Sequence, residues 1–274
     1  MTEALTRAVT LNNGVAMPIL GLGVFQSRPG AETREAVAAA LAIGYRHVDT
    51  ARVYGNERDV ASAIAASAVP RGEVFVTTKL WNTDHGYDAA LSAFDASEAR
   101  LGGPPDLYLV HFPVERLRRD TWRALGRLYA EKRVRAIGVS NFTVRHLEEL
   151  LGDGGVVPAV NQVEFHPFLF QRDLLAYCRA NGIQLEAYAP LVKAQKMGHP
   201  VLGRVAAAHA KTPAQVLVRW AIEHEVVVIP KSVQRTRIEE NARVFDFALT
   251  PDEVAALDAL DEGYRTSWDP SGVP

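Results

Sequence analysis

The stretch LYLVHFPVERLRRDTWRALGRLYAEKRVRAIGVS, residues 107–140, holds the repeating unit that decides the fold. Its first and last five residues are short runs in which neighbouring positions, rather than alternate ones, are apolar. That pattern is typical of parallel strands covered on both faces. Between the two runs, Asp120–Lys132 places Trp122, Leu125 and Tyr129 on one side of a helix. The stretch therefore predicts a strand, a helix and a second, parallel strand.

The same order of an apolar run followed by an amphipathic stretch recurs about eight times along the chain, with no Pro/Gly/Ser-rich linker. Eight such units favour a closed (β/α)8 barrel, the TIM barrel, built as one domain from residues 1–274. The rival fold is an open doubly wound sheet, which normally carries G-x-G-x-x-G after its first strand. Here Gly21-Leu22-Gly23-Val24-Phe25-Gln26 lacks the third glycine. The predicted strands are Leu20–Val24, Tyr45–Asp49, Val74–Lys79, Leu107–His111, Ala136–Ser140, Ala159–Glu164, Gln184–Tyr188 and Val226–Pro230.

Helices and one hairpin are predicted from local signals. Thr212-Pro213 and Thr250-Pro251 each place a capping Thr before a Pro, with a Gln or Glu three residues after the Thr. Val9–Met17, with Asn13-Gly14 at its centre, predicts a β-hairpin, which we expect to close the bottom of the barrel. The other helices predicted from apolar spacing are Thr33–Leu41, Asp88–Leu101 and Arg172–Asn181.

Composition limits the function classes. Among 274 residues, 48% are hydrophobic and the formal net charge is −2, so a large core is available and no basic excess points to nucleic acid or an anionic membrane. No apolar run is long enough to span a bilayer, and no signal segment is recognised. A lone Cys178 excludes an intrachain disulfide and a cysteine-only metal site, and no metal site is predicted. We expect a soluble, cytoplasmic protein that acts on small molecules.

Polar residues end several of the predicted strands, where barrel enzymes gather their catalytic groups. Lysine is scarce, with six lysines among the 30 basic residues, yet Lys79 directly follows an apolar strand. Burying a bare ammonium costs several kcal/mol, so Lys79 needs a partner, and Asp49 on the neighbouring strand is the obvious one. A purely structural buried ion pair is the alternative. The strand-end residues are Asp49, Lys79, His111, Ser140, Asn141, Gln162, Glu164, Tyr188, Lys231 and Ser232.

Tyr54 lies five residues after Asp49 in a predicted turn. A nearby Lys79 ammonium favours the phenolate, so we expect the pKa of Tyr54 to lie below its usual value near 10. Such a phenol donates a proton near neutral pH. His111, on the next strand, can orient a carbonyl oxygen through a ring N–H. Singly, each residue also fits packing or an ordinary hydrogen bond, but four of them at one barrel mouth predict a reaction site.

Taken as a set, these segments resemble the aldo-keto reductases, from about Leu11 to Asp261. Within that family the chain looks most like the bacterial 2,5-diketogluconate reductase type, because of Leu11-Asn12-Asn13-Gly14, Gly21–Phe25 and short later loops. The segments that carry the resemblance are Asp49–Glu57 (DTARVYGNE), Thr78–Trp81 (TKLW), Leu107–Pro113 (LYLVHFP), Ile137–Phe142 (IGVSNF), Val160–Pro167 (VNQVEFHP) and Val228–Val233 (VIPKSV).

The resemblance implies a barrel that uses NADPH to reduce aldehydes or ketones to alcohols. It assigns Tyr54 as the general acid, Asp49 and Lys79 as the residues that tune it, and His111 as the group that orients the substrate carbonyl. Hydride passes from the nicotinamide to the carbonyl carbon while Tyr54 supplies the proton to oxygen. A monomer is the family expectation.

The resemblance also implies a cofactor site along the strand ends. Ser140, Asn141 and Gln162 would hold the nicotinamide carboxamide, and Tyr188 would stack on the nicotinamide ring. A 2′-phosphate attracts a cation, a hydroxyl and a guanidinium, whereas NAD favours an acid on the ribose, so NADPH is expected rather than NADH. The remaining residues assigned to the cofactor are Val24, Asp49, Leu191, Lys231, Ser232, Val233, Arg237 and Asn241.

The substrate pocket is expected to have aromatic walls, formed by Phe25, Trp81, His111 and Phe112. Such a mouth fits small aldehydes, dicarbonyls, keto-sugars and aromatic aldehydes. Two open points concern neighbouring segments. Leu191-Val192-Lys193 stands where the family often has Leu-Gly beside the pyrophosphate, and Lys193 or Lys196 either supplies charge there or lies in solvent. Trp268 either folds over the substrate or packs on the barrel wall.

Two other functions compete. A strand-end lysine in a barrel also suits a Schiff-base lyase that uses Lys79, but this leaves Lys231, Ser232 and Arg237 unexplained. The third possibility is a nucleotide-sensing, non-catalytic barrel, although no extra interaction segment marks it.

Overall fold

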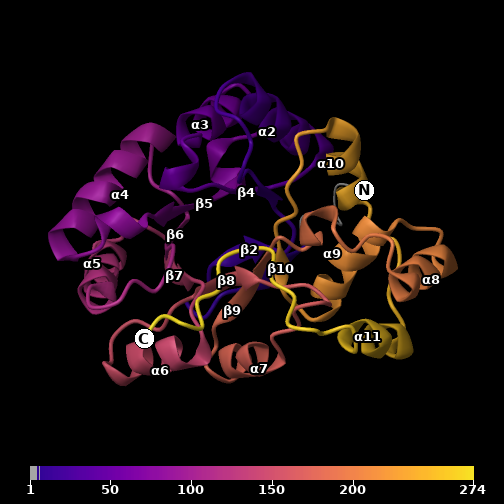
Figure 1. The fold of residues 1–274 in the computed structure, drawn as a ribbon. Helices are drawn as coiled ribbons and strands as arrows, with labels where there is room; N and C mark the ends of the chain where they lie inside the picture. The colour runs from indigo at the N-terminus through magenta and orange to yellow at the C-terminus, as the bar shows by residue number, and fades with distance from the viewer. Residues whose placement is uncertain (1–4, 6) are drawn as a thin grey trace.

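Parallel strands follow one another around a single sheet in the computed structural model, which describes Leu5 and residues 7–274 (Figure 1). Each strand pairs with the next one in the chain, and helices lie outside the strands. The strands of this sheet are β3 (Leu22–Gly23), β4 (His47–Asp49), β5 (Phe75–Leu80), β6 (Leu107–Val110), β7 (Ala136–Ser140), β8 (Val160–Glu164), β9 (Gln184–Tyr188) and β10 (Val227–Val228). All eight fall within or overlap the predicted runs.

The first and last strands close the sheet into a barrel. The N–H of Gly21 donates to the carbonyl of Val228 at 2.9 Å, and the N–H of Gly23 donates to that of Pro230 at 3.3 Å. A Cβ added at Gly23 would lie 2.9 Å from the carbonyl oxygen of Ile229, so only glycine lets the two backbones come this close. The predicted (β/α)8 barrel is confirmed.

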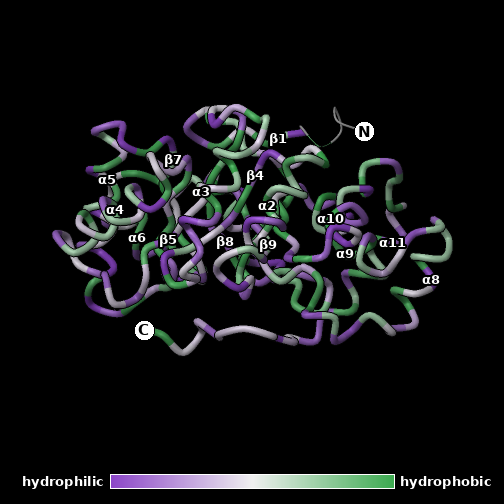
Figure 2. Tube along the Cα trace, turned by 90° about the horizontal axis from the view of Figure 1, so that it is seen from above, coloured by the Kyte–Doolittle hydropathy of each residue, from purple (hydrophilic) through white to green (hydrophobic). Residues whose placement is uncertain are grey.

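The predicted hairpin closes the amino ends of the strands. β1 (Ala8–Thr10) pairs with β2 (Ala16–Pro18) in antiparallel fashion, and Asn13 Nδ2 donates to the carbonyl of Arg135 at 3.0 Å. Figure 2 shows β1 at one side of the molecule and the C-terminal segment along the opposite side. The apolar residues of hairpin and strands that bury one another here are Leu11, Met17, Phe75, Leu107, Leu109, Ala136, Ala159, Val160 and Val227.

The helices include some that the sequence signals did not mark. Thr212 and Thr250 cap α9 and α11 with the expected capping boxes. The predicted helices correspond to α2, α4, α5 and α7, whereas α3, α6, α8 and α10 were not specified. The helices are α2 (Ala31–Ile43), α3 (Glu57–Ala65), α4 (Tyr87–Leu101), α5 (Arg118–Ala130), α6 (Val144–Gly152), α7 (Arg172–Ala180), α8 (Pro200–Ala208), α9 (Pro213–Glu223), α10 (Arg235–Ala242) and α11 (Pro251–Asp258). None of the described helices combines the length and apolar character needed to cross a membrane.

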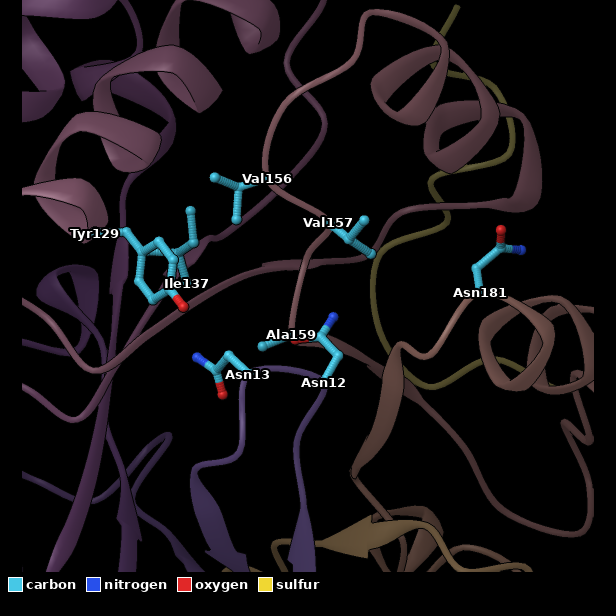
Figure 3. Close-up of a pocket in the computed structure, with 8 residues that line it drawn as sticks. All are labelled: Asn12, Asn13, Tyr129, Ile137, Val156, Val157, Ala159 and Asn181. Atoms are coloured by element: carbon cyan, nitrogen blue, oxygen red, sulfur yellow. The ribbon is translucent and has the colours of Figure 1, made fainter.

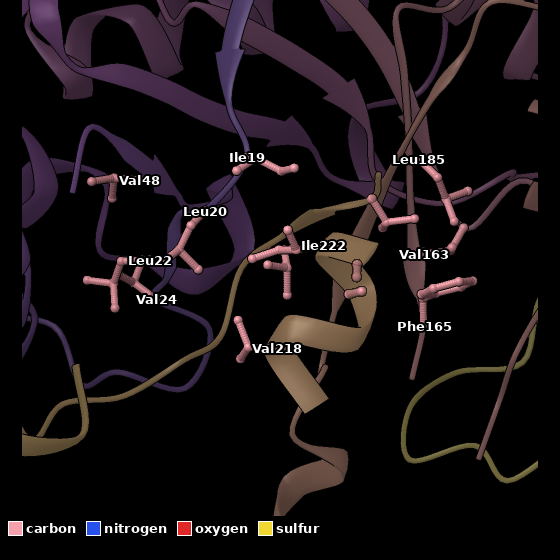
Figure 4. Packing of buried hydrophobic residues seen from close by; sticks show 14 of the residues in the cluster. Ile19, Leu20, Leu22, Val24, Val48, Val163, Phe165, Leu185, Val218 and Ile222 are labelled. Carbon is pink, nitrogen blue, oxygen red and sulfur yellow. The ribbon is translucent and has the colours of Figure 1, made fainter. Parts of the chain in front are cut away.

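The main apolar core lies between the strands and the surrounding helices. In Figure 4, Val218 and Ile222 of α9 lie beside strand residues such as Leu20 and Leu22. The barrel interior is different, because above the hairpin layer it holds buried polar side chains. These are His47, Asp49, Thr77, Lys79, Gln162 and Glu186, all at most 2% exposed.

Candidate active site

A cavity of about 590 Å³ opens at the carboxyl ends of the strands. Ten of the residues predicted for the site line it: Phe25, Asp49, Tyr54, His111, Ser140, Asn141, Gln162, Tyr188, Leu191 and Lys231. Its other lining residues are Gly23, Gln26, Val53, Ala189, Pro190, Lys193, Ile229, Thr266, Ser267 and Trp268. The topology therefore gathers side chains from both halves of the chain around one opening.

Tyr54, Lys79 and Asp49 form a connected group at the base of this cavity. Lys79 Nζ donates to both carboxylate oxygens of Asp49 at 2.7 Å and to the carbonyl of Thr50 at 2.9 Å. It also lies 3.4 Å from the phenol oxygen of Tyr54. Because Lys79 is fully buried, its ammonium needs hydrogen-bond acceptors other than water, and within the described chain these oxygens supply them.

The turn after β4 brings Tyr54 to the lysine. Residues Arg52–Tyr54 form one turn of 3₁₀ helix, and Gly55 ends it at φ 71°, a conformation that favours glycine. Buried Asn56 holds the turn in place, since its oxygen accepts from the Thr50 hydroxyl at 2.7 Å and its nitrogen donates to the carbonyl of Val24 at 3.0 Å. Local hydrogen bonds thus fix where the phenol points.

The expected lowering of the Tyr54 pKa was wrong. Burial raises the pKa of Tyr54 well above its usual value, and the carboxyl groups of Asp49 and Glu186 add to this shift. The physical reason is that the charge of Lys79 is already balanced by Asp49 at 2.7 Å. Tyr54 therefore holds its proton across the neutral range in the ligand-free protein.

His111 lies beside the phenol with its ring buried. Its ring centroid is 5.8 Å from that of Tyr54 and 5.1 Å from that of Trp81. Burial, assisted by the Lys79 charge, lowers the pKa of His111 well below its usual value, so the ring is neutral. A neutral imidazole has one N–H to donate and one nitrogen that accepts.

Ser140, Asn141 and Tyr188 are linked on the opposite wall of the cavity. The Tyr188 hydroxyl donates to Asn141 Oδ1 at 2.7 Å, and Asn141 Nδ2 donates to the carbonyl of His111 at 2.9 Å. Ser140 Oγ donates to the carbonyl of Gln162 at 2.8 Å. Gln162 itself donates to Asp49 at 2.8 Å, so this wall is connected to the Lys79 pair.

A basic segment lies beyond β10 at the start of α10. Lys231 and Arg237 are exposed, and within the described chain neither pairs with a carboxylate. Ser232 and Asn241 are buried beside them, and Val233 is half-buried. Unpaired cations next to polar side chains and a helix start are suited to an anionic phosphate group.

The segment after β9 adopts a strained path. Val192, Lys193 and Ala194 have φ values of 52°, 46° and 64°, although none of them is glycine. Val192 is fully buried, and Lys193 Nζ donates to the carbonyl of Thr266. Lys196 pairs instead with Glu262 at 2.7 Å. This segment is therefore tied to the C-terminal segment rather than loose in solvent.

The C-terminal segment, residues 264–274, crosses the cavity mouth. The N–H groups of Thr266 and Ser267 donate to the carboxylate of Glu164 at 2.7 and 3.0 Å. Trp268, 53% exposed, places its ring centroid 5.6 Å from Trp81 and 6.2 Å from Phe112. Trp268 is thus part of the cavity lining, and its folding over the substrate stays a prediction.

Several predicted residues lie outside the cavity lining. The side chain of Val24 is fully buried in the apolar core (Figure 4), so only its backbone faces other polar groups. Trp81 and Phe112, predicted to wall the substrate pocket, do not line the cavity and instead pack against Trp268, which does. The remaining predicted residues outside the lining are Lys79, which lies behind Tyr54, and Ser232, Val233, Arg237 and Asn241 at α10.

The sequence analysis missed Glu186 and His47 below the cavity, and Thr266 and Ser267 above it. The strand QLEAY, residues 184–188, carried a signal for the first, because Glu186 stands between apolar residues in a buried strand. His47 and Asp49 likewise share one face of β4 by their spacing of two. The C-terminal contacts had no local signal.

A second hollow lies at the other end of the barrel, beside the hairpin turn (Figure 3). Its volume is about 270 Å³, and its polar side chains are Asn12, Asn13, Tyr129 and Asn181. The amides of Asn12 and Asn13 already donate to backbone carbonyls of Pro158 and Arg135. With no acid, base or cation in its lining, this hollow does not compete as a reaction site.

Comparisons with known proteins agree with this geometry. The family model of the Aldo/keto reductase family matches residues 19–262. The chain is 49% identical over 271 residues to a glyoxal reductase from Bacillus subtilis, and the match covers 98% of each protein. It is 50% identical over 266 residues to a 9,11-endoperoxide prostaglandin H2 reductase from Trypanosoma cruzi, and that match covers 96% of this chain and 94% of the relative. A solved aldo-keto reductase from a Medee basin deep-sea metagenome library superposes with a TM-score of 0.94 at 45% identity, covering 98% of this chain and all of the other. A Bombyx mori aldo-keto reductase in complex with NADP superposes with a TM-score of 0.89 at 35% identity, covering 95% and 94%. The chain therefore belongs to the aldo/keto reductase family.

Proposed function

We propose that this chain, acting as a single domain, is an NADPH-dependent reductase of aldehydes and ketones, with Tyr54 as its general acid. The observation that supports this best is the contact of 3.4 Å between Tyr54 Oη and Lys79 Nζ at the base of an aromatic-walled cavity. A protonated phenol beside a buried ion pair is suited to give up its proton when negative charge develops nearby.

Tyr54 delivers the proton of the reaction. As the carbonyl oxygen gains electron density, its proton comes from the Tyr54 hydroxyl, and the resulting phenolate lies beside the Lys79 ammonium. Asp49 keeps that ammonium in place and prevents the pocket from carrying a full unpaired positive charge. When bound, NADPH supplies the hydride that the carbonyl carbon accepts, so that one hydride and one proton give the alcohol.

His111 orients the carbonyl. Its neutral ring lies within 5.8 Å, centroid to centroid, of the Tyr54 ring, so one ring N–H and the phenol can both donate to one oxygen in the cavity. Two donors at the same oxygen stabilise the charge that builds there.

The donor set of the strand ends fits a dinucleotide phosphate. Ser140, Asn141 and Gln162 supply amide and hydroxyl groups at the carboxamide end, and Tyr188 supplies an aromatic face. At the other end, Lys231 and Arg237 form no ion pair within the described chain, which leaves them for the 2′-phosphate. The NADP bound by the Bombyx mori relative supports this choice.

The substrate class we propose is small, reactive carbonyls, above all 2-oxoaldehydes, together with keto-sugars and aromatic aldehydes. The aromatic rings of Phe25, Trp81, Phe112 and Trp268 around the mouth accept compact apolar or flat groups. The glyoxal reductase among the relatives supports the dicarbonyl choice. The resemblance to the 2,5-diketogluconate reductase type supports the keto-sugars.

The test is a substrate panel with both reduced cofactors. Methylglyoxal, an aromatic aldehyde, a keto-sugar and a quinone are each incubated with the purified chain and NADPH or NADH, and cofactor oxidation is followed by absorbance. We expect NADPH-dependent reduction of methylglyoxal. A covalent adduct trapped by borohydride, without NADPH oxidation, would instead support a lyase that uses Lys79, and NADPH binding without turnover would support a sensing role.

A further inference from the structure

One amide nitrogen lies between two buried acids beneath the cavity. Gln162 Nε2 is 2.8 Å from Asp49 Oδ2 and 2.9 Å from Glu186 Oε2. An amide NH₂ group has two hydrogens, so these two contacts use both of them. The carboxylate of Asp49, paired with Lys79, only accepts hydrogen bonds, so the amide atom that both acids contact is the nitrogen, and this fixes which way the amide is turned. Gln162 lines the cavity, so its free carbonyl oxygen is the atom left for a ligand.

Apart from Gln162, the side chain of Glu186 has no hydrogen-bond partner in the described chain. It is fully buried in β9, and its second oxygen, Oε1, has no hydrogen-bond partner. On that side His47 Nε2 lies 3.6 Å away, which is longer than a hydrogen bond. No Lys or Arg forms an ion pair with Glu186 among the described residues. A buried acid of this kind costs free energy to keep, so its contact with Gln162 needs an explanation.

The residues around Glu186 hold it firmly. His47 Nε2 lies 3.2 Å from the Thr77 hydroxyl, and a Cβ added at Gly21 would fall 2.5 Å from His47 Nδ1. The histidine ring therefore fills the space beside the first strand and limits the positions open to the Glu186 side chain. Gln162 and Glu186 also lie on paired residues of neighbouring strands, β8 and β9.

We propose that Glu186 is a positioning residue for cofactor binding, which turns the Gln162 amide so that its carbonyl oxygen accepts a hydrogen bond from the NH₂ of the nicotinamide carboxamide. This proposal rests on the proposed use of NADPH. It adds a residue below the cavity, out of reach of the cofactor, that selects for a carboxamide through the amide it orients.

The charges around Glu186 are consistent with this role. The groups that face it are Asp49, Lys79, His47 and Tyr54. Burial, with the Asp49 charge, raises the pKa of Glu186 to about 8, and burial lowers the pKa of His47 to about 3. At neutral pH both are uncharged, so Glu186 accepts from Gln162 without adding a second negative charge beside Lys79.

The experiment compares NADPH with its acetylpyridine analogue, in which a methyl ketone replaces the carboxamide and no NH₂ is present. Dissociation constants of both are measured by tryptophan fluorescence for the wild type, Glu186→Gln, Glu186→Met and, as control, Glu57→Met. Glu57 is an equally buried acid that pairs with Arg100 and the Thr78 hydroxyl, away from the cavity lining. Thermal unfolding of each variant is recorded alongside.

The wild type is expected to prefer NADPH by about three- to tenfold, the range that one net hydrogen bond gives. Glu186→Met should remove most of that preference by weakening NADPH alone, whereas Glu186→Gln, which keeps an acceptor, should retain it within about twofold. Glu57→Met should lower stability and leave the preference unchanged.

Three outcomes would overturn the proposal. The first is a wild type that binds NADPH and the acetylpyridine analogue equally well. The second is a Glu186→Met variant that still prefers NADPH. The third is a Glu186→Met variant that binds both nucleotides more weakly by the same factor, which would indicate a purely structural role. If Glu186→Met does not fold, Glu186→Leu takes its place, and the wild-type comparison alone still decides the first outcome. A wild type that binds neither nucleotide would contradict the proposed function instead.

Discussion

The ammonium of Lys79 lies 2.7 Å from both carboxylate oxygens of Asp49, and the two side chains are almost wholly removed from solvent. Each buried charge is stabilised by the other, because a lone buried ion costs several kcal/mol. The pair connects β4 to β5 and also explains why the phenol of Tyr54 keeps its proton beside a lysine.

Asp49→Asn should lower the free energy of unfolding by about 3 kcal/mol or more, since Lys79 would be left as an unbalanced buried charge. The double variant Asp49→Asn/Lys79→Met should recover much of that loss, because no charge remains. Urea denaturation of the three proteins measures this. Asp120→Asn, which breaks an exposed pair with Arg123, is the control and should change stability by less than about 1 kcal/mol. Equal effects at the two sites would contradict the argument.

Tyr54→Phe should lower turnover by at least about 10²-fold, the lower end of what a positioned general acid contributes. The variant keeps the ring that packs on Phe25 at 5.0 Å and loses only the hydroxyl, so NADPH binding should change little. Steady-state rates with methylglyoxal and cofactor titrations check both parts. Near-normal turnover in this variant would remove Tyr54 from its assigned role.

Arg237→Ala should weaken NADPH by about tenfold or more and NADH by less than about twofold, because a charge-assisted bond to the 2′-phosphate is lost only in the first case. Arg123→Ala, at an exposed arginine on α5, is the matched control and should affect neither. Titration of each protein with both nucleotides measures the ratio. Equal losses for NADPH and NADH would refute the assignment.

Most of the barrel was predictable because its strands are buried on both faces, which leaves consecutive apolar residues as a visible pattern. The hairpin was predictable from Asn13-Gly14, since that pair favours a tight turn. Helix α6 was missed although it is as long as the predicted α7 and is capped by Thr143, and α10 was missed because few of its residues are both buried and apolar. The main catalytic candidates could be named from strand ends, as the fold brings those ends together.

The electrostatics and the C-terminal contacts could not be predicted in the same way. The pKa of Tyr54 depends first on the burial of its phenol and then on the charges of Asp49 and Glu186, and all of these depend on the folded structure rather than on sequence spacing. The N–H of Thr266 donates to the carboxylate of Glu164, which lies 102 positions earlier in the chain, and no local sequence pattern predicts this contact. Such long-range contacts are visible only once the chain is folded.

Trp268→Ala should raise the KM for aromatic aldehydes by about three- to tenfold, because the lost ring packs on Trp81 and Phe112 over the mouth. The melting temperature should hardly change, since Trp268 is 53% exposed. Val157→Ala, an exposed apolar residue beside the hairpin at the other end of the barrel, is the control and should leave KM unchanged. An unaltered KM in Trp268→Ala would show that this ring does not contact the substrate.

Glu186→Gln should become more stable than the wild type as pH rises. The pKa of Glu186 is raised from an ordinary 4.5 to about 8 in the folded protein, so the folded state keeps a proton that the unfolded chain releases. The stability that this proton contributes is fully present below pH 4.5 and is lost as pH rises through 8.

The glutamine variant has no such proton. The unfolding free energy of Glu186→Gln minus that of the wild type should therefore be constant below pH 4.5. It should then grow by on the order of 1 kcal/mol per pH unit up to pH 8 and level off above that pH. His47, whose pKa is lowered to about 3, is present in both proteins and cancels in the comparison. Urea denaturation across this pH range measures the difference, and a difference that stays constant through it would mean that Glu186 is already ionised in the barrel.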